Sequence, residues 1–298
     1  MGTDDLKGRL RASIPRPLWS MARGLHWSPP ARYLRRLVAR HEAARAPLSQ
    51  LRTILLFIGY PRSGHSLVGS LLSAHRHCIV AHELHAMWYV EHGFSLDELA
   101  GLMIRRDRWF ERNNRQWTEY NYAVPDQWQG ATEEMVVLGD KKGDGVTDYV
   151  HRYPGLIQHV VAAADQRGLS VRIVHTVRNP FDNTATMVRR TGDPLEYVIE
   201  RHTKRVALNQ YLISTLPPGM VHTIRHEDLI AQPHQELRKL VAHVGLDAPD
   251  DYVDACSSIL YAAPHRSRDT IPWPAAQRQR VDELIDRVPF LGGYSFER

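Results

Sequence analysis

One segment near residue 60 combines glycines, hydroxyl groups and basic side chains at a spacing that suits anion binding. It is Gly59-Tyr60-Pro61-Arg62-Ser63-Gly64-His65-Ser66, which follows an apolar run and precedes apolar residues at helical spacing. Glycines let backbone N–H groups close around an anion at a helix N-terminus. The spacing is that of a P-loop, with His65 in the position where P-loop nucleotide hydrolases carry lysine. We therefore expect an anion cradle in which Arg62 supplies positive charge.

Basic side chains recur after four of the five short apolar runs in the chain. Ligands of parallel sheets bind outside the carboxyl ends of the strands, so the residues that follow each run are candidates for a shared site. This pattern predicts a ring of positive charge suited to a ligand with two separated anionic groups. The residues concerned are Arg62, either Lys141 or Lys142, Arg178 and Arg225.

Proton-accepting side chains follow the second apolar run. His82, Glu83 and His85 come directly after it, at the same predicted edge of the sheet. A carboxylate or an imidazole in this position could take a proton from an acceptor hydroxyl. For any one of these histidines, the alternative is a hydrogen-bonded structural role.

Short apolar runs alternate with helical patterns from residue 53 onward. The runs cover residues 53–58, 78–81, 135–138, 171–177 and 221–224, and helical periodicity appears between them. Runs of this length are typical of strands buried on both faces. We expect an α/β fold of the P-loop type: a doubly wound parallel sheet flanked by helices, within one domain spanning residues 53–298.

Residues 84–130 are predicted to form a helical insertion over the strand ends, on the side where an acceptor would bind. The segment contains Trp88, Trp109, Trp117 and Trp128 together with several tyrosines. Aromatic rings beside polar groups suit sugar, phenol or apolar alcohol acceptors equally. The alternative is that these rings form the core of the insertion.

The basic character of the chain is concentrated in residues 1–52. This arm carries 11 Lys and Arg against 3 Asp and Glu, whereas the rest of the chain is slightly acidic. A nucleic-acid-binding domain is therefore not expected. Tyr33, Leu34, Leu37 and Val38 recur at helical spacing and predict an amphipathic helix. It either contacts an anionic membrane surface or a partner, or caps the domain with its arginine face in solvent.

The location of the protein can also be predicted from the sequence. No apolar run reaches the length of a membrane span, and no signal peptide is evident. Cys78 and Cys256 form neither a metal-binding nor a redox pair. These features predict a cytoplasmic protein in a reducing compartment.

Taken together, these motifs resemble those of sulfotransferases that use 3′-phosphoadenosine 5′-phosphosulfate (PAPS), over roughly residues 53–296. The family's first motif is similar to Pro61-Arg62-Ser63-Gly64-His65-Ser66, and its second to Arg178-Asn179-Pro180 with Thr186. Leu72, Ala74, His75 and Glu83 resemble the tyrosylprotein branch. His265-Arg266-Ser267-Arg268 followed by Trp273 resembles the C-terminal cofactor loop.

The resemblance implies PAPS as co-substrate, no metal, and direct in-line transfer of a sulfuryl group to a hydroxyl of a small-molecule or glycan acceptor. It implies Glu83 as the base, and Arg62 and Lys141 as stabilisers of developing charge. The co-substrate would be held by Pro61, Arg62, Ser63, Gly64, His65, Ser66, Arg178, Thr186, Ser267 and Arg268.

Two other functions fit parts of the pattern. A P-loop kinase would use ATP with Mg²⁺, but His65 in the lysine position and the lack of an aspartate in the Walker-B position count against it. A non-catalytic protein could use the same cradle to bind an anion. Within the sulfotransferase hypothesis, His82 or His85 could replace Glu83 as the base.

Overall fold

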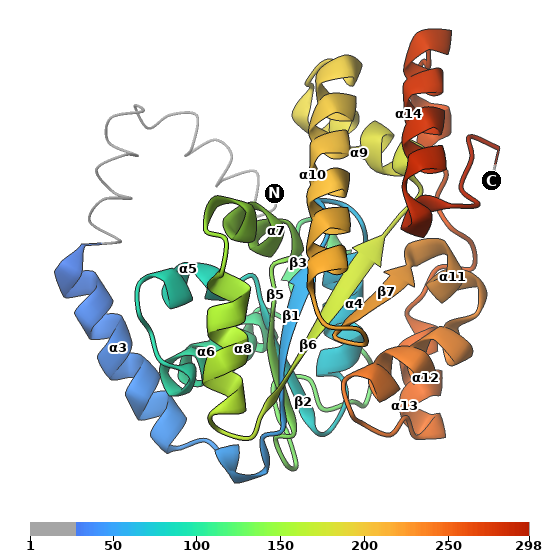
Figure 1. Ribbon diagram of the computed structural model, residues 1–298. Coiled ribbons are helices and arrows are strands. Elements are labelled where there is room, and N and C mark those ends of the chain that lie inside the picture. The colour runs from blue at the N-terminus through green and yellow to red at the C-terminus, as the bar shows by residue number, and fades with distance from the viewer. Residues whose placement is uncertain (1–27, 298) are drawn as a thin grey trace, which may run out of the picture.

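The computed structural model describes residues 28–297, and a five-stranded sheet lies at its centre (Figure 1). The strand order is β2-β5-β1-β6-β7, and every pairing is parallel. The strands are β1 (Thr53–Ile58), β2 (Cys78–His82), β5 (Val137–Lys141), β6 (Ser170–Val177) and β7 (Val221–Arg225). The predicted α/β class with a helix-flanked parallel sheet is thus confirmed.

The remaining elements are helices and one short hairpin. The α-helices are α3 (Pro29–Ala44), α4 (His65–Ser73), α5 (Ala86–Glu91), α6 (Leu96–Arg112), α7 (Gly143–Arg152), α8 (Leu156–Asp165), α9 (Pro180–Thr191), α10 (Leu195–Thr215), α11 (His226–Ala231), α12 (Pro233–His243), α13 (Asp250–Ser258) and α14 (Ala275–Arg287). The 3₁₀ helices are η1 (Leu48–Gln50), η2 (Ser267–Thr270) and η3 (Pro289–Leu291), and the hairpin pairs β3 (Gln116–Trp117) with β4 (Tyr120–Asn121).

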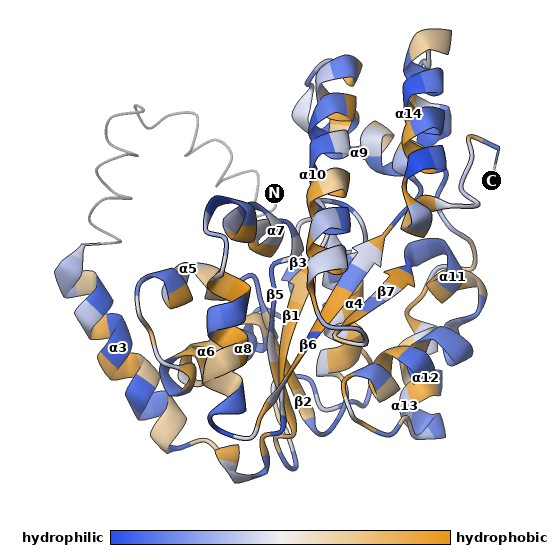
Figure 2. Ribbon diagram, viewed as in Figure 1, coloured by the Kyte–Doolittle hydropathy of each residue, from blue (hydrophilic) through white to orange (hydrophobic). Residues whose placement is uncertain are grey.

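Strand β1 supplies side chains to two separate hydrophobic cores. Ile54, Leu56 and Ile58 join the core shared with α5, α6, α7 and α8. Leu55 and Phe57 join the core formed with α4, α12 and α13. Alternate residues of a strand point to opposite faces, so a strand buried on both faces must be apolar throughout. Figure 2 shows this apolar sheet between helices that carry both hydrophilic and apolar residues.

Strand β5 starts and ends later than the apolar run at residues 135–138 predicts. It covers Val137–Lys141, so Lys141 is its last residue and does not follow it. Glycine is needed at position 139 because a Cβ there would lie only 2.5 Å from the Leu55 carbonyl oxygen. Asp140 fits because its buried carboxylate is hydrogen-bonded, which compensates for its polarity. Hydropathy alone therefore missed the polar half of a buried strand.

Helix α3 packs along α6, at a point where the backbones come very close. A Cβ at Gly101 would overlap the Ala39 carbonyl. The inward side of α3 carries Arg36 and Arg40, which both donate to the buried Glu98 carboxylate at 2.8 Å. Helix α3 thus packs on the domain with Arg36 turned inward, whereas the side chain of Arg40 stays 66% exposed despite its contact with Glu98.

Two findings complete the description of the fold. Within residues 28–297 no helix is both long and apolar enough to span a bilayer. The part of the predicted basic arm formed by residues 1–27 lies outside the described residues.

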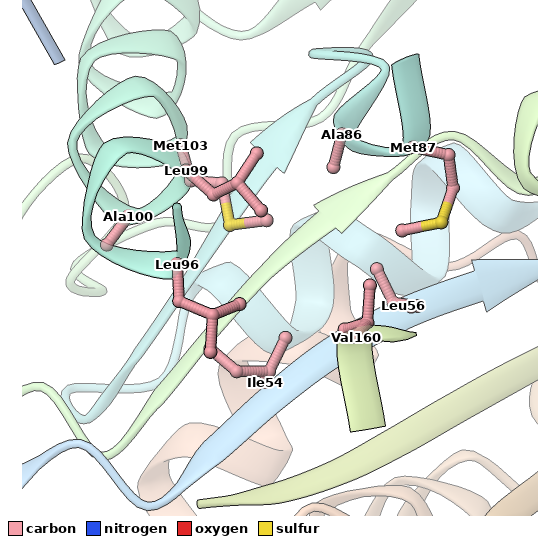
Figure 3. Close-up of a pocket in the computed structure, with 9 residues that line it drawn as sticks. All are labelled: Ile54, Leu56, Ala86, Met87, Leu96, Leu99, Ala100, Met103 and Val160. Atoms are coloured by element: carbon pink, nitrogen blue, oxygen red, sulfur yellow. The ribbon is translucent and has the colours of Figure 1, made fainter. Parts of the chain in front are cut away.

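A small void lies in the hydrophobic core. Figure 3 shows this void of about 10 Å³ between α5, α6, α8 and β1, lined only by apolar residues such as Met87 and Met103. It offers no polar partner to a ligand and belongs to the core.

Candidate active site

The loop between β1 and α4 is held in a fixed conformation by buried hydrogen bonds. The Ser63 hydroxyl donates to the Tyr60 carbonyl at 2.9 Å and is hydrogen-bonded to Thr176 Oγ1 at 2.7 Å. Asn183 of α9 donates to the Pro61 carbonyl at 2.7 Å. The Ser63 side chain thus shapes the loop from inside and does not line the cavity that the loop borders.

The loop requires backbone conformations that few side chains tolerate. Gly64, the N-cap of α4, has φ 95°, and a Cβ there would come 2.7 Å from Nδ1 of His226. Arg62 adopts a left-handed φ of 68° despite its side chain. Strained non-glycine residues of this kind cluster at functional sites.

A cluster of charged side chains lies beside the loop at the ends of β2 and β5. Lys141 Nζ donates to Oε1 of Glu83 at 3.0 Å and to the Ser66 hydroxyl at 2.9 Å. Lys142 Nζ donates to the other oxygen of Glu83 at 2.9 Å and lies 3.5 Å from Asp144. One carboxylate is thus held between two ammonium groups next to the anion cradle.

The backbone turn that presents Glu83 is fixed by a buried carboxylate. Asp140 accepts hydrogen bonds from the N–H groups of Leu84, at 2.9 Å, and Ala86, at 2.7 Å. This turn places Glu83 and His85 in left-handed conformations, with φ 57° and 75°. Burial raises the pKa of Asp140 to about 6. Asp140 therefore holds the backbone and leaves the cavity to Glu83.

The charge on Glu83 is set by two opposing effects. Burial alone would raise its pKa, but the ammonium groups of Lys141 and Lys142 outweigh burial and hold the pKa well below its usual range. Burial lowers the pKa of Lys141, and contact with Glu83 partly restores it. Glu83 is consequently ionised at neutral pH, as a proton acceptor must be.

Of the three residues predicted as candidate bases, Glu83 lines the cavity and the two histidines do not. His82 is buried, stacks on Phe110 with ring centroids 4.0 Å apart, and has its Nε2 3.3 Å from Lys141 Nζ. His85 packs edge-on against Tyr149. Burial lowers the pKa of both imidazoles.

A second polar cluster surrounds Arg178, beyond the end of β6. Arg178 donates to the Thr186 hydroxyl at 3.2 Å, to the His265 carbonyl at 3.0 Å and to the Ser267 hydroxyl at 3.1 Å. Thr186 in turn donates to Ser267 at 3.0 Å. The structure thus brings together three of the residues predicted to bind the far end of the co-substrate. All partners of this guanidinium among residues 28–297 are uncharged.

Two predicted basic residues lie elsewhere. Arg268 is buried in an ion pair with Asp182 and donates to the carbonyls of Ser295 and Phe296, so it is not among the cavity residues. Arg225 lies over the Tyr294 ring, 3.8 Å from its centroid, and is not part of the predicted positive ring. Arg268 and Arg225 both contact residues 294–296 near the C-terminus. The positions of basic residues relative to the strands do not reveal such contacts.

The clusters open into one cavity of about 940 Å³. Glu83, Arg62 and Arg178 line it together with the β3–β4 hairpin, which contributes Trp117 and Tyr122. Residues 84–130 were expected to form a helical insertion over the strand ends. The helices of this segment do not line the cavity, and α6 packs against β2 and α3. Trp88 and Trp109 likewise pack away from the cavity, on His92 and Arg106.

Several cavity residues were not assigned to the site from the sequence. Arg189 and Arg190 lie one turn beyond Thr186 on α9, and a helical periodicity of three to four residues was the signal that could have revealed them. His226 was not assigned either; it and the predicted site residue His65 have unpartnered Nδ1 atoms, and burial lowers the pKa of each to about 4. Both rings are therefore neutral at physiological pH.

Several solved sulfotransferase structures are similar to this chain. The sulfotransferase domain of the Synechococcus PCC 7002 olefin synthase is 19% identical over 79% of this chain and 94% of its own length, with a TM-score of 0.50. The sulfotransferase domain from the curacin biosynthetic pathway is 16% identical over 81% of this chain and 100% of that domain, with a TM-score of 0.47. Sulfotransferase STF9 from Mycobacterium avium is 9% identical over 87% of this chain and 82% of that one, with a TM-score of 0.48.

The first of these structures supports the fold alone. The chain has no significant match among curated proteins. The family model described as the sulfotransferase family matches residues 55–250, which is most of the domain and includes the loop, Glu83, both lysines and the Arg178 cluster up to Thr186. By this match, the chain belongs to the sulfotransferase family.

Proposed function

We propose that this protein transfers the sulfuryl group of PAPS to a hydroxyl group of a small-molecule or glycan acceptor. The observation that carries the proposal is the single cavity into which the anion loop, the Glu83–lysine cluster and the Arg178 cluster all open. Two anion sites joined by one cavity suit a ligand with a phosphosulfate at one end and a phosphate at the other.

The charges of the cavity fit such a ligand. Arg62, Arg178 and Arg189 line it, and none of them has a carboxylate partner among residues 28–297. Arginine forms its strongest hydrogen bonds with anionic oxygens. We assign the 5′-phosphosulfate end to the loop from Pro61 to Ser66 and the 3′-phosphate to Arg178, Thr186 and Ser267.

The residues near the loop fit the roles that sulfuryl transfer requires. When bound, PAPS would supply the sulfuryl group and be left as 3′,5′-adenosine bisphosphate. Glu83 is ionised and reaches the cavity, so it is our candidate for accepting the proton of the acceptor hydroxyl. Lys141 and Arg62 would stabilise negative charge that develops on the transferred group and the departing phosphate. No covalent bond to the protein is needed.

The acceptor side of the cavity is formed by aromatic and aliphatic side chains. The hairpin supplies Trp117, Tyr120 and Tyr122, and the loop after α13 supplies Leu260 and Tyr261. Rings that carry hydroxyl or N–H groups pack against a ring or a sugar and can also hydrogen-bond to it. We propose that the acceptor hydroxyl enters between these two segments.

Isothermal titration with 3′,5′-adenosine bisphosphate in metal-free buffer tests the proposal, with ATP and Mg²⁺ as the parallel titrant. We expect the bisphosphate to bind, and Arg178→Ala to weaken binding at least tenfold. Arg225→Ala is the matched control, since this arginine ends strand β7 but lies outside the cavity. If ATP with Mg²⁺ binds and the bisphosphate does not, the protein is a kinase and the sulfotransferase proposal fails. Binding of the bisphosphate without turnover toward phenol, sugar and aliphatic alcohol acceptors would favour a non-catalytic binding protein.

A further inference from the structure

The outward side of α3 carries an apolar strip. Tyr33, Leu34 and Leu37 are 63%, 61% and 43% exposed, which places three large apolar side chains in solvent within two helical turns. Among the described residues, these three are the exposed large hydrophobic side chains that lie closest together in sequence. We call Tyr33, Leu34 and Leu37 the α3 strip.

The strip faces outward because the opposite side of α3 is committed to the domain. Arg36 donates to Glu98 at 2.8 Å and to the carbonyls of His92 and Gly93 at 2.9 Å. The close approach of Ala39 to Gly101 fixes the helix against α6. Rotating α3 to bury the strip would break these contacts and leave the buried Glu98 carboxylate without its cations, which is costly.

The surroundings of the strip are cationic. Arg45 is exposed at the end of the helix, and the two arginines Arg36 and Arg40 share the single carboxylate of Glu98, which leaves one positive charge uncompensated. The carboxylate of Glu42, the acidic residue within α3, is paired with Arg108 at 3.0 Å. Residues 1–27, which lead directly into α3, contain five Lys and Arg, two Asp, and Trp19 and Trp27. An apolar strip with positive flanks matches the interface of an anionic bilayer.

The size of the strip also favours a lipid surface over a protein. Stable protein interfaces bury about 800 Å² on each partner, far more than three side chains provide. An amphipathic helix needs only to place its apolar side chains at the headgroup boundary, and cationic residues then add electrostatic attraction. We propose that the α3 strip docks this protein onto anionic phospholipid bilayers.

Co-sedimentation of the full chain with vesicles tests the proposal. We compare vesicles of phosphatidylcholine alone with vesicles containing 30% phosphatidylglycerol, at 50 and 500 mM NaCl. We expect at least tenfold stronger binding to the anionic vesicles at low salt, and a large loss at high salt because charges are screened. Combined Tyr33→Ser, Leu34→Ser and Leu37→Ser should reduce binding at least tenfold. Tyr211→Ser, at an equally exposed tyrosine on α10, should leave it unchanged.

A labelled variant identifies what covers the strip. Cys78 and Cys256 are buried, so Leu34→Cys provides a selectively reactive thiol for an environment-sensitive dye. We expect a blue shift only when anionic vesicles are added, and none for dye on Tyr211→Cys. A dye already shielded in the absence of vesicles would overturn the proposal in favour of a second copy or of residues 1–27. Dimerisation that is lost in the triple variant would do the same, as would equal sedimentation of the triple variant and the native chain.

Discussion

Lys141 Nζ contacts Oε1 of Glu83 at 3.0 Å while also donating to Ser66 in the anion loop. One ammonium group therefore links the candidate base to the candidate anion site. An anion in the loop would compete with Glu83 for this cation. Because loss of a nearby positive charge raises the pKa of a carboxylate, Glu83 would become a stronger base only once the loop is filled.

Replacing the candidate base should separate turnover from binding. Glu83→Gln keeps the shape of the side chain but removes its ability to accept a proton, so we expect turnover to fall by about 10²- to 10⁴-fold. Affinity for 3′,5′-adenosine bisphosphate should be kept or rise, because Lys141 no longer shares its charge with a carboxylate. Release of the bisphosphate in the presence of acceptor alcohols measures the effect. Near-native turnover would transfer the role to His82 or His85, and His85→Gln is the matched control.

The second lysine should set the acid limit of activity. Lys142 contacts Glu83 at 2.9 Å, and its charge helps hold the pKa of Glu83 down. Lys142→Ala should raise this pKa, so that Glu83 becomes protonated, and activity is lost, at a higher pH than in the native protein. The pH dependence of kcat/KM measures the shift. Lys142→Arg preserves the charge and should restore the native profile; an identical acid limb in all three proteins would contradict the prediction.

Asp140 should act on catalysis through the turn that it holds. In Asp140→Asn the side chain has one carbonyl oxygen left to serve two N–H groups, so Leu84 or Ala86 loses its acceptor. We expect a stability loss of about 1–3 kcal/mol. We also expect kcat to fall at least tenfold, because Glu83 is no longer fixed beside the lysines, while bisphosphate affinity is retained.

The control for Asp140→Asn is Glu200→Gln, which removes a carboxylate from an exposed ion pair with Lys204. Exposed pairs contribute little to stability, so this variant should behave as the native protein in both assays. An Asp140→Asn variant that loses stability but keeps its native kcat would show that the turn is not needed to position Glu83.

Buried histidines should make the protein less stable in mild acid. Burial lowers the pKa of His175 from 6.5 to about 3. Between these values the unfolded chain binds the proton and the folded protein does not, so the free energy of unfolding falls as pH falls. The loss amounts to about 2 kcal/mol for this residue between pH 6.5 and 5. Urea unfolding at pH 7 and 5 measures it, and His175→Gln should show a smaller difference between the two pH values.

The parts of the fold that were predictable from sequence are those in which one physical property dominates. Strand β1 is almost entirely apolar because both of its faces are buried, so its apolar run predicted it. Strand β6 was predicted from its valines and isoleucine, although it also carries Arg172 and His175. Strand β5 was misplaced because Asp140 is polar yet satisfied by backbone N–H groups that come from another part of the chain. Such compensation depends on tertiary contacts, which no local pattern contains.

Site residues could be predicted where they lie shortly after the end of a strand. Arg62, Glu83 and Arg178 line the cavity as expected. Arg268 has the same residue type but is satisfied by Asp182, a partner 86 positions away. The contact between Arg36 and the buried carboxylate of Glu98 could not be predicted for a similar reason, since Glu98 lies 62 positions away in the sequence. The similarity to the tyrosylprotein branch remains a prediction.

The left-handed backbone at Arg62 means that folding and activity can be separated at this position. A non-glycine residue in this conformation costs about 1–2 kcal/mol. Glycine would relieve this cost but lose about 0.5–1 kcal/mol through the greater freedom of the unfolded chain. Arg62→Gly should therefore fold about as well as the native protein and lose only what the guanidinium does in the cavity. Glu83 has a left-handed φ of 57° as well, but Glu83→Gly would leave the buried Lys141 ammonium without its carboxylate, so folding and activity are coupled there.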